Sequence, residues 1–200
     1  MAKRSLRKLS RDALNPKEDR ALFYQEAMSG SDRSAAIMMG AIVENALGSL
    51  ITLHLKRRDK NTIEALYERD GPLSTFFSVI NLAYAMGLIN KPVSESLHSI
   101  RRIRNVFAHS SRPHTFATRE IGAACTKIKV RYREPPLNLK IIRNPRDIYV
   151  ISSAILAARF SRLSAARSRQ AAEKAKRRIK QIEDKITRLK ALQRGSHHKS

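Results

Sequence analysis

The feature that most constrains the fold is a run of about fifty residues without a helix breaker, from Asn144-Pro145 to Gly195. Asn and Pro commonly begin a helix, and a continuous helix of this length reaches about 75 Å, well beyond the diameter of a domain this size. Its first part carries apolar residues that can pack on a core: Ile148, Val150, Ile151, Ile155, Leu156 and Phe160. The sequence therefore predicts a helix that begins in the core and then leaves it.

The second part of this predicted helix is strongly basic. Residues 159–194 contain thirteen Lys and Arg against three acids, a net charge of +10. We expect its most concentrated cations to bind nucleic acid: Lys174, Lys176, Arg177, Arg178 and Lys180. A short heptad rhythm formed by Ile179, Ile182, Ile186, Leu189 and Leu192 favours a brief coiled-coil seam. A solvated basic tail is the alternative interpretation.

The chain as a whole is strongly basic. Forty Lys and Arg against 17 Asp and Glu give a net charge of +23, so we expect a nucleic-acid partner bound with low sequence selectivity. A basic N-terminal arm, residues 1–16, should contribute to this binding through Lys3, Arg4, Arg7, Lys8 and Arg11. The single cysteine, Cys125, cannot form an intrachain disulfide or a zinc cluster. No metal or cofactor is predicted.

The remaining residues indicate one helical body. With 42% hydrophobic residues, the chain can form one compact domain, which we place at residues 17–160, followed by a basic helical extension at 161–200. The longest apolar run, residues 35–41, is too short to span a bilayer, and the charged N-terminus has no signal-peptide pattern. We therefore expect a cytoplasmic protein that does not enter a membrane.

The most apolar predicted helix, residues 32–56, should be the central core helix. Glu44 lies within its apolar pattern, where a carboxylate needs a partner, and the arginines of residues 101–104 are candidates. The alternative is that Glu44 merely reaches the solvent edge. Gly40 and Gly48 lower helix propensity by roughly 1 kcal/mol each, so they indicate close approach of other helices.

Shorter helices are predicted around this core helix. Composition and breakers indicate helices at residues 17–28, 63–69 and 118–129, with a loop at 132–144. A further helix should begin at Pro72 and end at Gly87, and the next should open at Asn90. That helix buries a stripe of Val93, Leu97, Ile100, Ile103 and Phe107. His98 falls on its polar side and is expected to be solvated.

The end of the helix that opens at Asn90 concentrates the chemistry of the chain. Asn105 and His109 share one face, with Arg101 one turn back and Arg104 just beside them. An arginine fork suits a phosphate, and histidine can transfer a proton near neutral pH. The alternative is purely structural, because Arg and His also stabilise helix C-termini through the helix dipole.

These residues carry a resemblance to known families. An arginine, a polar residue, three more residues and a histidine resemble the signature of the HEPN superfamily, many members of which are metal-independent ribonucleases. Residues 70–76 (DGPLSTF), 80–89 (INLAYAMGLI) and 103–109 (IRNVFAH) are similar to the mannitol operon repressor family. The resemblance covers about residues 23–160. It implies an all-α fold, a HEPN-like helical bundle. The long basic helix predicted above follows this bundle at its C-terminus and lies outside the resemblance.

The resemblance implies two functions. The mannitol operon repressor family is named for transcriptional regulation, yet no helix-turn-helix pair that could read a major groove is evident. In a HEPN-like ribonuclease, Arg104 would hold the scissile phosphate, Asn105 would orient neighbouring groups and His109 would be general acid or base. We favour a regulator that acts through protein partners, nonspecific nucleic-acid binding or both, and that forms a homodimer. A metal-independent endoribonuclease is the alternative, and a scaffolding protein is a third possibility.

Overall fold

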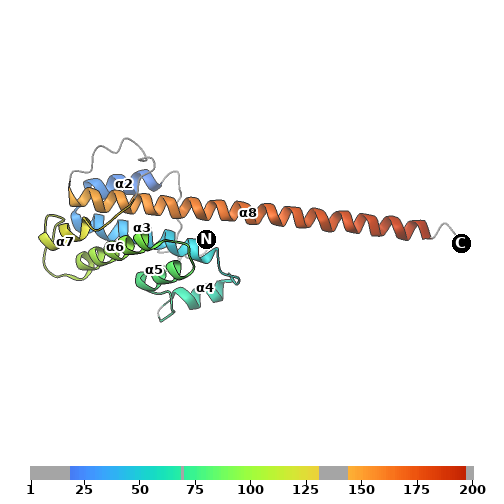
Figure 1. Cartoon of the computed structure of the whole chain (residues 1–200), viewed down its shortest axis with the longest axis horizontal. Coiled ribbons are helices and arrows are strands. Elements are labelled where there is room, and N and C mark those ends of the chain that lie inside the picture. Colours follow the sequence, from blue (N-terminus) through green and yellow to red (C-terminus); the bar gives the residue numbers. More distant parts are fainter. Residues whose placement is uncertain (1–18, 69, 131–143, 197–200) are drawn as a thin grey trace, which may run out of the picture.

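A computed structural model describes residues 19–68, 70–130 and 144–196 of the chain, which fold into helices and contain no strand (Figure 1). The predicted all-α class with a long basic C-terminal helix is therefore confirmed. The predictions for the N-terminal arm and for the loop at 132–143 lie outside the described residues. The helices are α2 (Asp19–Ser29), α3 (Asp32–Thr52), α4 (Lys60–Tyr67), α5 (Phe76–Ala85), α6 (Lys91–His109), α7 (Arg119–Cys125) and α8 (Pro145–Ser196).

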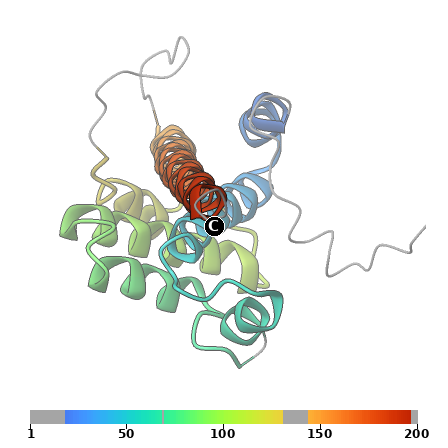
Figure 2. The same cartoon turned by 90° about the vertical axis from the view of Figure 1, so that its right-hand side faces the viewer.

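Helix α3 is the central element of the body, as predicted. It packs against α2, α5, α6 and α8, and the views in Figures 1 and 2 place it between α8 and the α5–α6 layer. The side-chain oxygen of Ser31 accepts a hydrogen bond from the Ser34 amide and caps its first turn. The helix ends at Thr52, four residues before the predicted end, and the cap residue Leu53 donates its amide to the carbonyl of Ser49.

The two glycines of α3 mark close contacts within the chain. A Cβ atom on Gly40 would lie 2.8 Å from Cγ of Arg104 and 3.2 Å from the Tyr149 hydroxyl, so α6 and α8 both approach α3 here. At Gly48 the nearest atom would be Cε1 of Tyr67, at 3.4 Å. The predicted packing role of both glycines is confirmed. Side chains of the same chain fill the space beside both glycines.

Helix α5 begins later than the sequence indicates. Pro72 lies in the turn after α4, where the Leu73 amide donates to the carbonyl of Leu66, and α5 starts only at Phe76. Thr75 is the true cap, since its hydroxyl accepts a hydrogen bond from the Ser78 amide. The predicted start at Pro72 is therefore wrong. The predicted end is confirmed, because Gly87 has the positive φ of 68° that favours glycine.

Helix α7 is shorter than the predicted helix at 118–129, and the chain turns back along α6 after it. Cys125 ends α7 and is fully buried, and burial raises the pKa of its thiol to about 12, so it behaves as an apolar core residue. The Lys129 amide then donates a hydrogen bond of 3.0 Å to the hydroxyl of Ser96 on α6. This contact holds residues 126–129 beside α6.

Helix α8 begins inside the body and continues far beyond it (Figure 1). At its first turn Arg146 donates to Asp32 at 2.7 Å and to the carbonyls of Ala27 and Gly30, which fixes α8 to the turn between α2 and α3. The buried Tyr149 hydroxyl donates to the Ala36 carbonyl at 2.8 Å. Among the side chains of α8 that are described, up to residue 186, Phe160 is the last that is fully buried. The division of the chain at residues 160 and 161 stays a prediction.

From residue 168 to residue 186, α8 is exposed on every side. Arg167 donates from Nε to the carbonyl of Leu53 at 3.2 Å, a contact between a cation and the C-terminal end of α3. Residues 168–186 are all exposed, and Figure 1 shows this part of α8 projecting from the body. A segment of that length spans about 28 Å. Three residues of the predicted seam are about half exposed, Ile179 at 56%, Ile182 at 59% and Ile186 at 46%.

Two helices are long and apolar enough to cross a membrane on length and composition alone, namely Asp32–Thr52 and Pro145–Ile186. The core helix of a soluble protein passes the same test, and about half of each apolar window is buried inside the body. In α3 the buried residues include Val43, Leu47 and Ile51, which are in the protein core. The apolar character of these two helices is thus accounted for by the packing of the body.

Candidate functional site

Helix α6 has the two faces that its sequence indicates. Asn90 caps it by accepting a hydrogen bond from the Val93 amide, and Pro92 lies in the first turn. The predicted apolar stripe is buried against the body: Val93, Leu97, Ile100, Ile103 and Phe107. At about 100° per residue, Arg104 lies about 40° from Ile100 around the helix, whereas His109 lies about 180° from it. Arg104 is therefore at the edge of the buried stripe, and His109 is on the opposite side.

The Arg104 side chain is held by contacts with other residues of the same chain. One terminal nitrogen, Nη2, donates to Oε2 of Glu44 on α3 at 2.8 Å, and the guanidinium carbon lies 5.9 Å from the centre of the Phe76 ring. The side chains of Arg104 and Glu44 are 24% and 26% exposed. Within the described residues, Nε of Arg104 is buried and has no hydrogen-bond partner. The predicted partnership between Glu44 and an arginine of the signature is confirmed.

The attraction between Arg104 and Glu44 does not fully offset the free-energy cost of burying the Glu44 carboxylate. Burial raises the pKa of the Glu44 carboxyl above its ordinary value, and the attraction of Arg104 lowers that pKa by less. Removing a carboxylate from water commonly costs more than its ion pair returns. The pair therefore specifies where α6 sits on α3 more than it adds to stability. Removal of Arg104 would leave Glu44 with burial and no counter-charge.

Asn105 and His109 form no comparable contact within the described residues. Asn105 is partly buried and His109 is exposed in the last turn of α6. Among residues 19–68, 70–130 and 144–196, neither side chain makes a hydrogen bond or an ion pair. Because Arg104 turns toward α3, the structure does not bring Arg104 and His109 together within one chain. Their predicted catalytic roles stay predictions.

The Arg101 side chain contacts Phe77 of α5. Its guanidinium carbon lies 5.3 Å from the centre of the Phe77 ring, a cation–π distance, and the His98 ring centre lies 5.5 Å from the same ring. Arg102, on the other side, donates from Nη2 to the Ser99 hydroxyl at 3.3 Å. Arg101 and Arg102 thus belong to a surface whose lining does not include Asn105 or His109.

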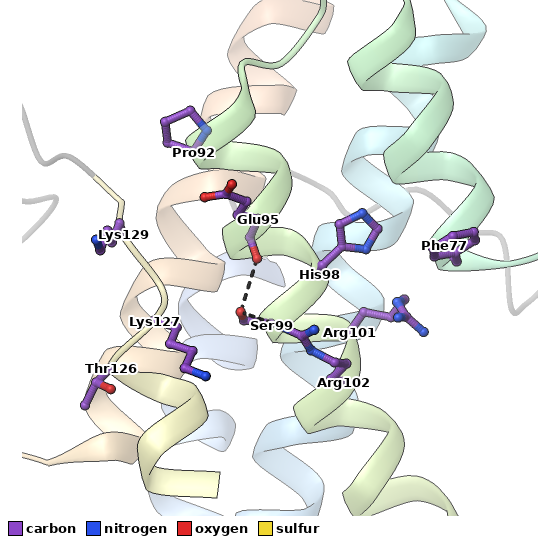
Figure 3. A pocket seen from close by; sticks show the side chains of 10 residues that line it. All are labelled: Phe77, Pro92, Glu95, His98, Ser99, Arg101, Arg102, Thr126, Lys127 and Lys129. Atoms are coloured by element: carbon purple, nitrogen blue, oxygen red, sulfur yellow. Dashed lines mark hydrogen bonds between the residues drawn. The ribbon is translucent and has the colours of Figure 1, made fainter. Parts of the chain in front are cut away.

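This surface is a basic cleft of about 610 Å³ between α5, α6 and residues 126–129 (Figure 3). It is lined by Phe77, Pro92, Glu95, His98, Ser99, Arg101, Arg102, Thr126, Lys127 and Lys129. His98, expected to be solvated, lies partly buried here. Burial lowers its pKa below the ordinary value, and the charges of Arg101 and Arg102 lower it further. The imidazole is consequently neutral at pH 7.

Sequence reasoning missed most of this cleft. Phe77 reads as a core residue in an apolar run, yet it is 50% exposed. Lys127 and Lys129 come to α6 only because the chain turns after α7, and the hydrogen bonds between Lys129 and Ser96 hold them there. A signal did exist in the adjacent pair Arg101 and Arg102, two cations with no acid within five residues on α6.

The basic residues of α8 form a second charged surface. Lys174, Lys176, Arg178 and Lys180 are exposed, and Arg177 forms an ion pair of 3.5 Å with Glu173 in which both side chains remain mostly exposed. Such a pair is weak and leaves the arginine free to exchange partners. The basic residues predicted for the N-terminal arm lie outside the described residues. No group of three His, Cys, Asp or Glu side chains suited to a metal ion occurs in the described part of the chain.

The helices described above resemble those of a solved structure, and the sequence matches a family model that extends into the basic part of α8. The chain resembles the X-ray structure of the MtlR–HPr complex from Escherichia coli with a TM-score of 0.55 and 20% sequence identity, covering 71% of this chain and 98% of that one. At this identity the likeness shows the fold. No curated protein matches the sequence. The model of the mannitol repressor family matches residues 26–193, most of the 200 residues. The chain belongs to the mannitol repressor family.

Proposed function

We propose that this protein is a cytoplasmic transcriptional regulator that is not an enzyme, with a helical body that binds a protein partner and an α8 extension that holds nucleic acid. One observation carries the proposal: residues 168–186 form a basic helix exposed on every side, next to a body with a compact core. A helix without neighbours has no structural use for so many cations. Nucleic acids are abundant polyanions, and their phosphates would neutralise these cations.

Binding through α8 would show little sequence selectivity. Lys and Arg on such a helix contact phosphates and release counterions, whereas sequence reading needs a helix held in a groove by a second element. In the described part of the chain no second helix packs across residues 168–186. The N-terminal arm, with Lys3, Arg4, Arg7, Lys8 and Arg11, would add contacts of the same kind.

A protein partner is the second part of the proposal. The similar structure is a complex of MtlR with HPr, and its likeness covers a share of this chain about as large as the body. This supports an HPr protein as a partner of the body. Selectivity for a promoter would then come from the partner or from another protein at the operon, because α8 supplies affinity alone.

Size-exclusion chromatography with light-scattering detection tests the proposed protein partnership. We expect the chain alone to elute with the mass of a homodimer, and purified HPr to add one copy for each chain. Glutamine in place of Lys174, Lys176, Arg177, Arg178 and Lys180 should leave HPr binding unchanged, because the partner would contact the body. Absence of a complex at 100 µM of each protein, or its loss in the glutamine variant, would contradict the assignment.

The metal-independent ribonuclease remains the second candidate. One observation favours it: His109 is exposed, and the Asn105 side chain makes no hydrogen bond within the described residues. In that function Arg104 would bind the scissile phosphate, with Asn105 and His109 beside it. The ion pair of Arg104 with Glu44 opposes this role, because the phosphate would have to displace the carboxylate. We therefore rank regulation without catalysis first.

A further inference from the structure

The basic cleft between α5, α6 and residues 126–129 combines an unusual charge balance with a defined volume. Four cations line it, Arg101, Arg102, Lys127 and Lys129, against one carboxylate, Glu95. Its volume of about 610 Å³ lies within the range of small-molecule sites. Neither the family match nor the similar structure assigns a ligand to this surface, and it is separate from the basic part of α8.

The arginines of the cleft lack the partner that Arg104 has. Within residues 19–68, 70–130 and 144–196, neither Arg101 nor Arg102 forms an ion pair, although they lie within three residues of Arg104. Nε of Arg101 is buried with no hydrogen-bond partner in the same part of the chain. Burial, together with the charges of Arg102 and Arg104, lowers the pKa of Arg101. An anion in the cleft would relieve this repulsion.

The two ends of the cleft differ in chemistry (Figure 3). On one side of α6, Arg102 reaches the Ser99 hydroxyl, and Lys127 comes from the segment after α7. On the other side, Phe77 and Arg101 lie near one another, with His98 beside them. The first end offers hydrogen-bond donors to a phosphate, and the second offers flat apolar and guanidinium surfaces to a planar ring.

We propose that this cleft binds a nucleotide, with its phosphate on Arg102 and Lys127 and its base against Phe77 and Arg101. A single phosphate ester suits the cleft better than a nucleic-acid strand. Glu95 lies one turn before Ser99 on α6 and would repel a phosphate chain that continued toward Lys129. The neutral His98 ring adds apolar surface on the side of the base. The site gives a regulator a means to respond to a small molecule, and it does not depend on α8.

Isothermal titration of the full-length protein with AMP, glucose 6-phosphate and inorganic phosphate tests the site. We expect AMP to bind at least tenfold more tightly than either of the other two ligands, because only AMP carries a base for Phe77 and Arg101. Arg102→Gln with Lys127→Gln should weaken AMP at least tenfold. Phe77→Ala should weaken AMP while leaving inorganic phosphate unchanged.

A matched control removes the same charge elsewhere, Lys176→Gln with Arg178→Gln on α8. This variant should bind AMP as the parent does, and circular dichroism should show unchanged helix content and melting temperature in all variants. The proposal is overturned if AMP fails to bind at 5 mM, if AMP and inorganic phosphate bind equally, or if the α8 control loses AMP affinity as much as the cleft variant. The proposal is also overturned if the cleft variant loses affinity for an oligonucleotide while the parent protein binds no AMP.

Discussion

Glutamine at Lys174, Lys176, Arg177, Arg178 and Lys180 is expected to lower the affinity of the protein for duplex DNA about a hundredfold at 150 mM salt. On a helix, Lys174, Arg177 and Arg178 share one side, and Lys176 and Lys180 lie on another. A duplex would therefore contact about three of the five cations at once. Each phosphate that is no longer neutralised should reduce the slope of log affinity against log salt by about 0.9, so the slope should fall by about three units.

The measurement is fluorescence anisotropy of a labelled duplex over a series of salt concentrations. The control variant carries glutamine at five exposed cations of the body: Lys56, Arg57, Arg58, Lys91 and Arg119. It has the same net charge as the α8 variant, so general attraction between the protein and DNA falls equally in both. An equal loss of affinity in the two variants would contradict a binding role for α8. It would show that the affinity for DNA depends on the net charge of the protein alone.

Arg104→Ala is expected to lower the free energy of unfolding by about 2 kcal/mol at pH 7, between the values typical of surface and buried ion pairs. The substitution leaves Glu44 partly buried without a counter-charge and removes the aliphatic stem that packs on Gly40. Urea unfolding followed by circular dichroism measures the loss. Addition of Glu44→Gln should recover about 1 kcal/mol, because the neutral amide is less costly to bury.

The pH dependence of this loss has a definite sign. Burial already places the pKa of Glu44 in the folded protein above its ordinary value, and loss of Arg104 raises that pKa further. A raised carboxyl pKa means that the folded state binds the proton more tightly, so its stability falls as pH rises through the interval above about 4.5. The penalty of Arg104→Ala should therefore shrink as the pH is lowered from 7 toward 4.5. A penalty that stays constant over this interval would show that Glu44 is not its source.

Local signals in the sequence were sufficient to predict several elements. The absence of a breaker predicted α8, Asn90 and Gly87 predicted one helix end each, and the three-and-four spacing predicted the buried stripe of α6. The need of a buried carboxylate for a partner predicted the contact between Glu44 and the signature arginines. Each of these signals depends on neighbours along one helix, or on a strong cost of burial.

The remaining features depend on tertiary contacts that no local pattern contains. Arg101 contacts Phe77 because α5 packs beside α6, and Lys127 joins the cleft because the chain reverses after Cys125. The start of α5 at Phe76 was missed because Pro72 and Thr75 are both good helix starters, and the hydrogen bond from Leu73 to Leu66 selects the later one. Side-chain direction at the edge of a buried stripe, as for Arg104, is likewise set by the partner helix.

The central claim is that the protein holds nucleic acid and regulates without cleaving it. The most direct measurement incubates the folded protein with end-labelled mixed RNA in EDTA, beside a His109→Ala variant, and resolves both binding and products on gels. We expect both proteins to retard the RNA equally and to leave its length unchanged, with equal melting temperatures. Cleavage that yields 2′,3′-cyclic phosphate ends and drops at least a hundredfold in a well-folded His109→Ala protein would contradict the account and establish the ribonuclease in its place.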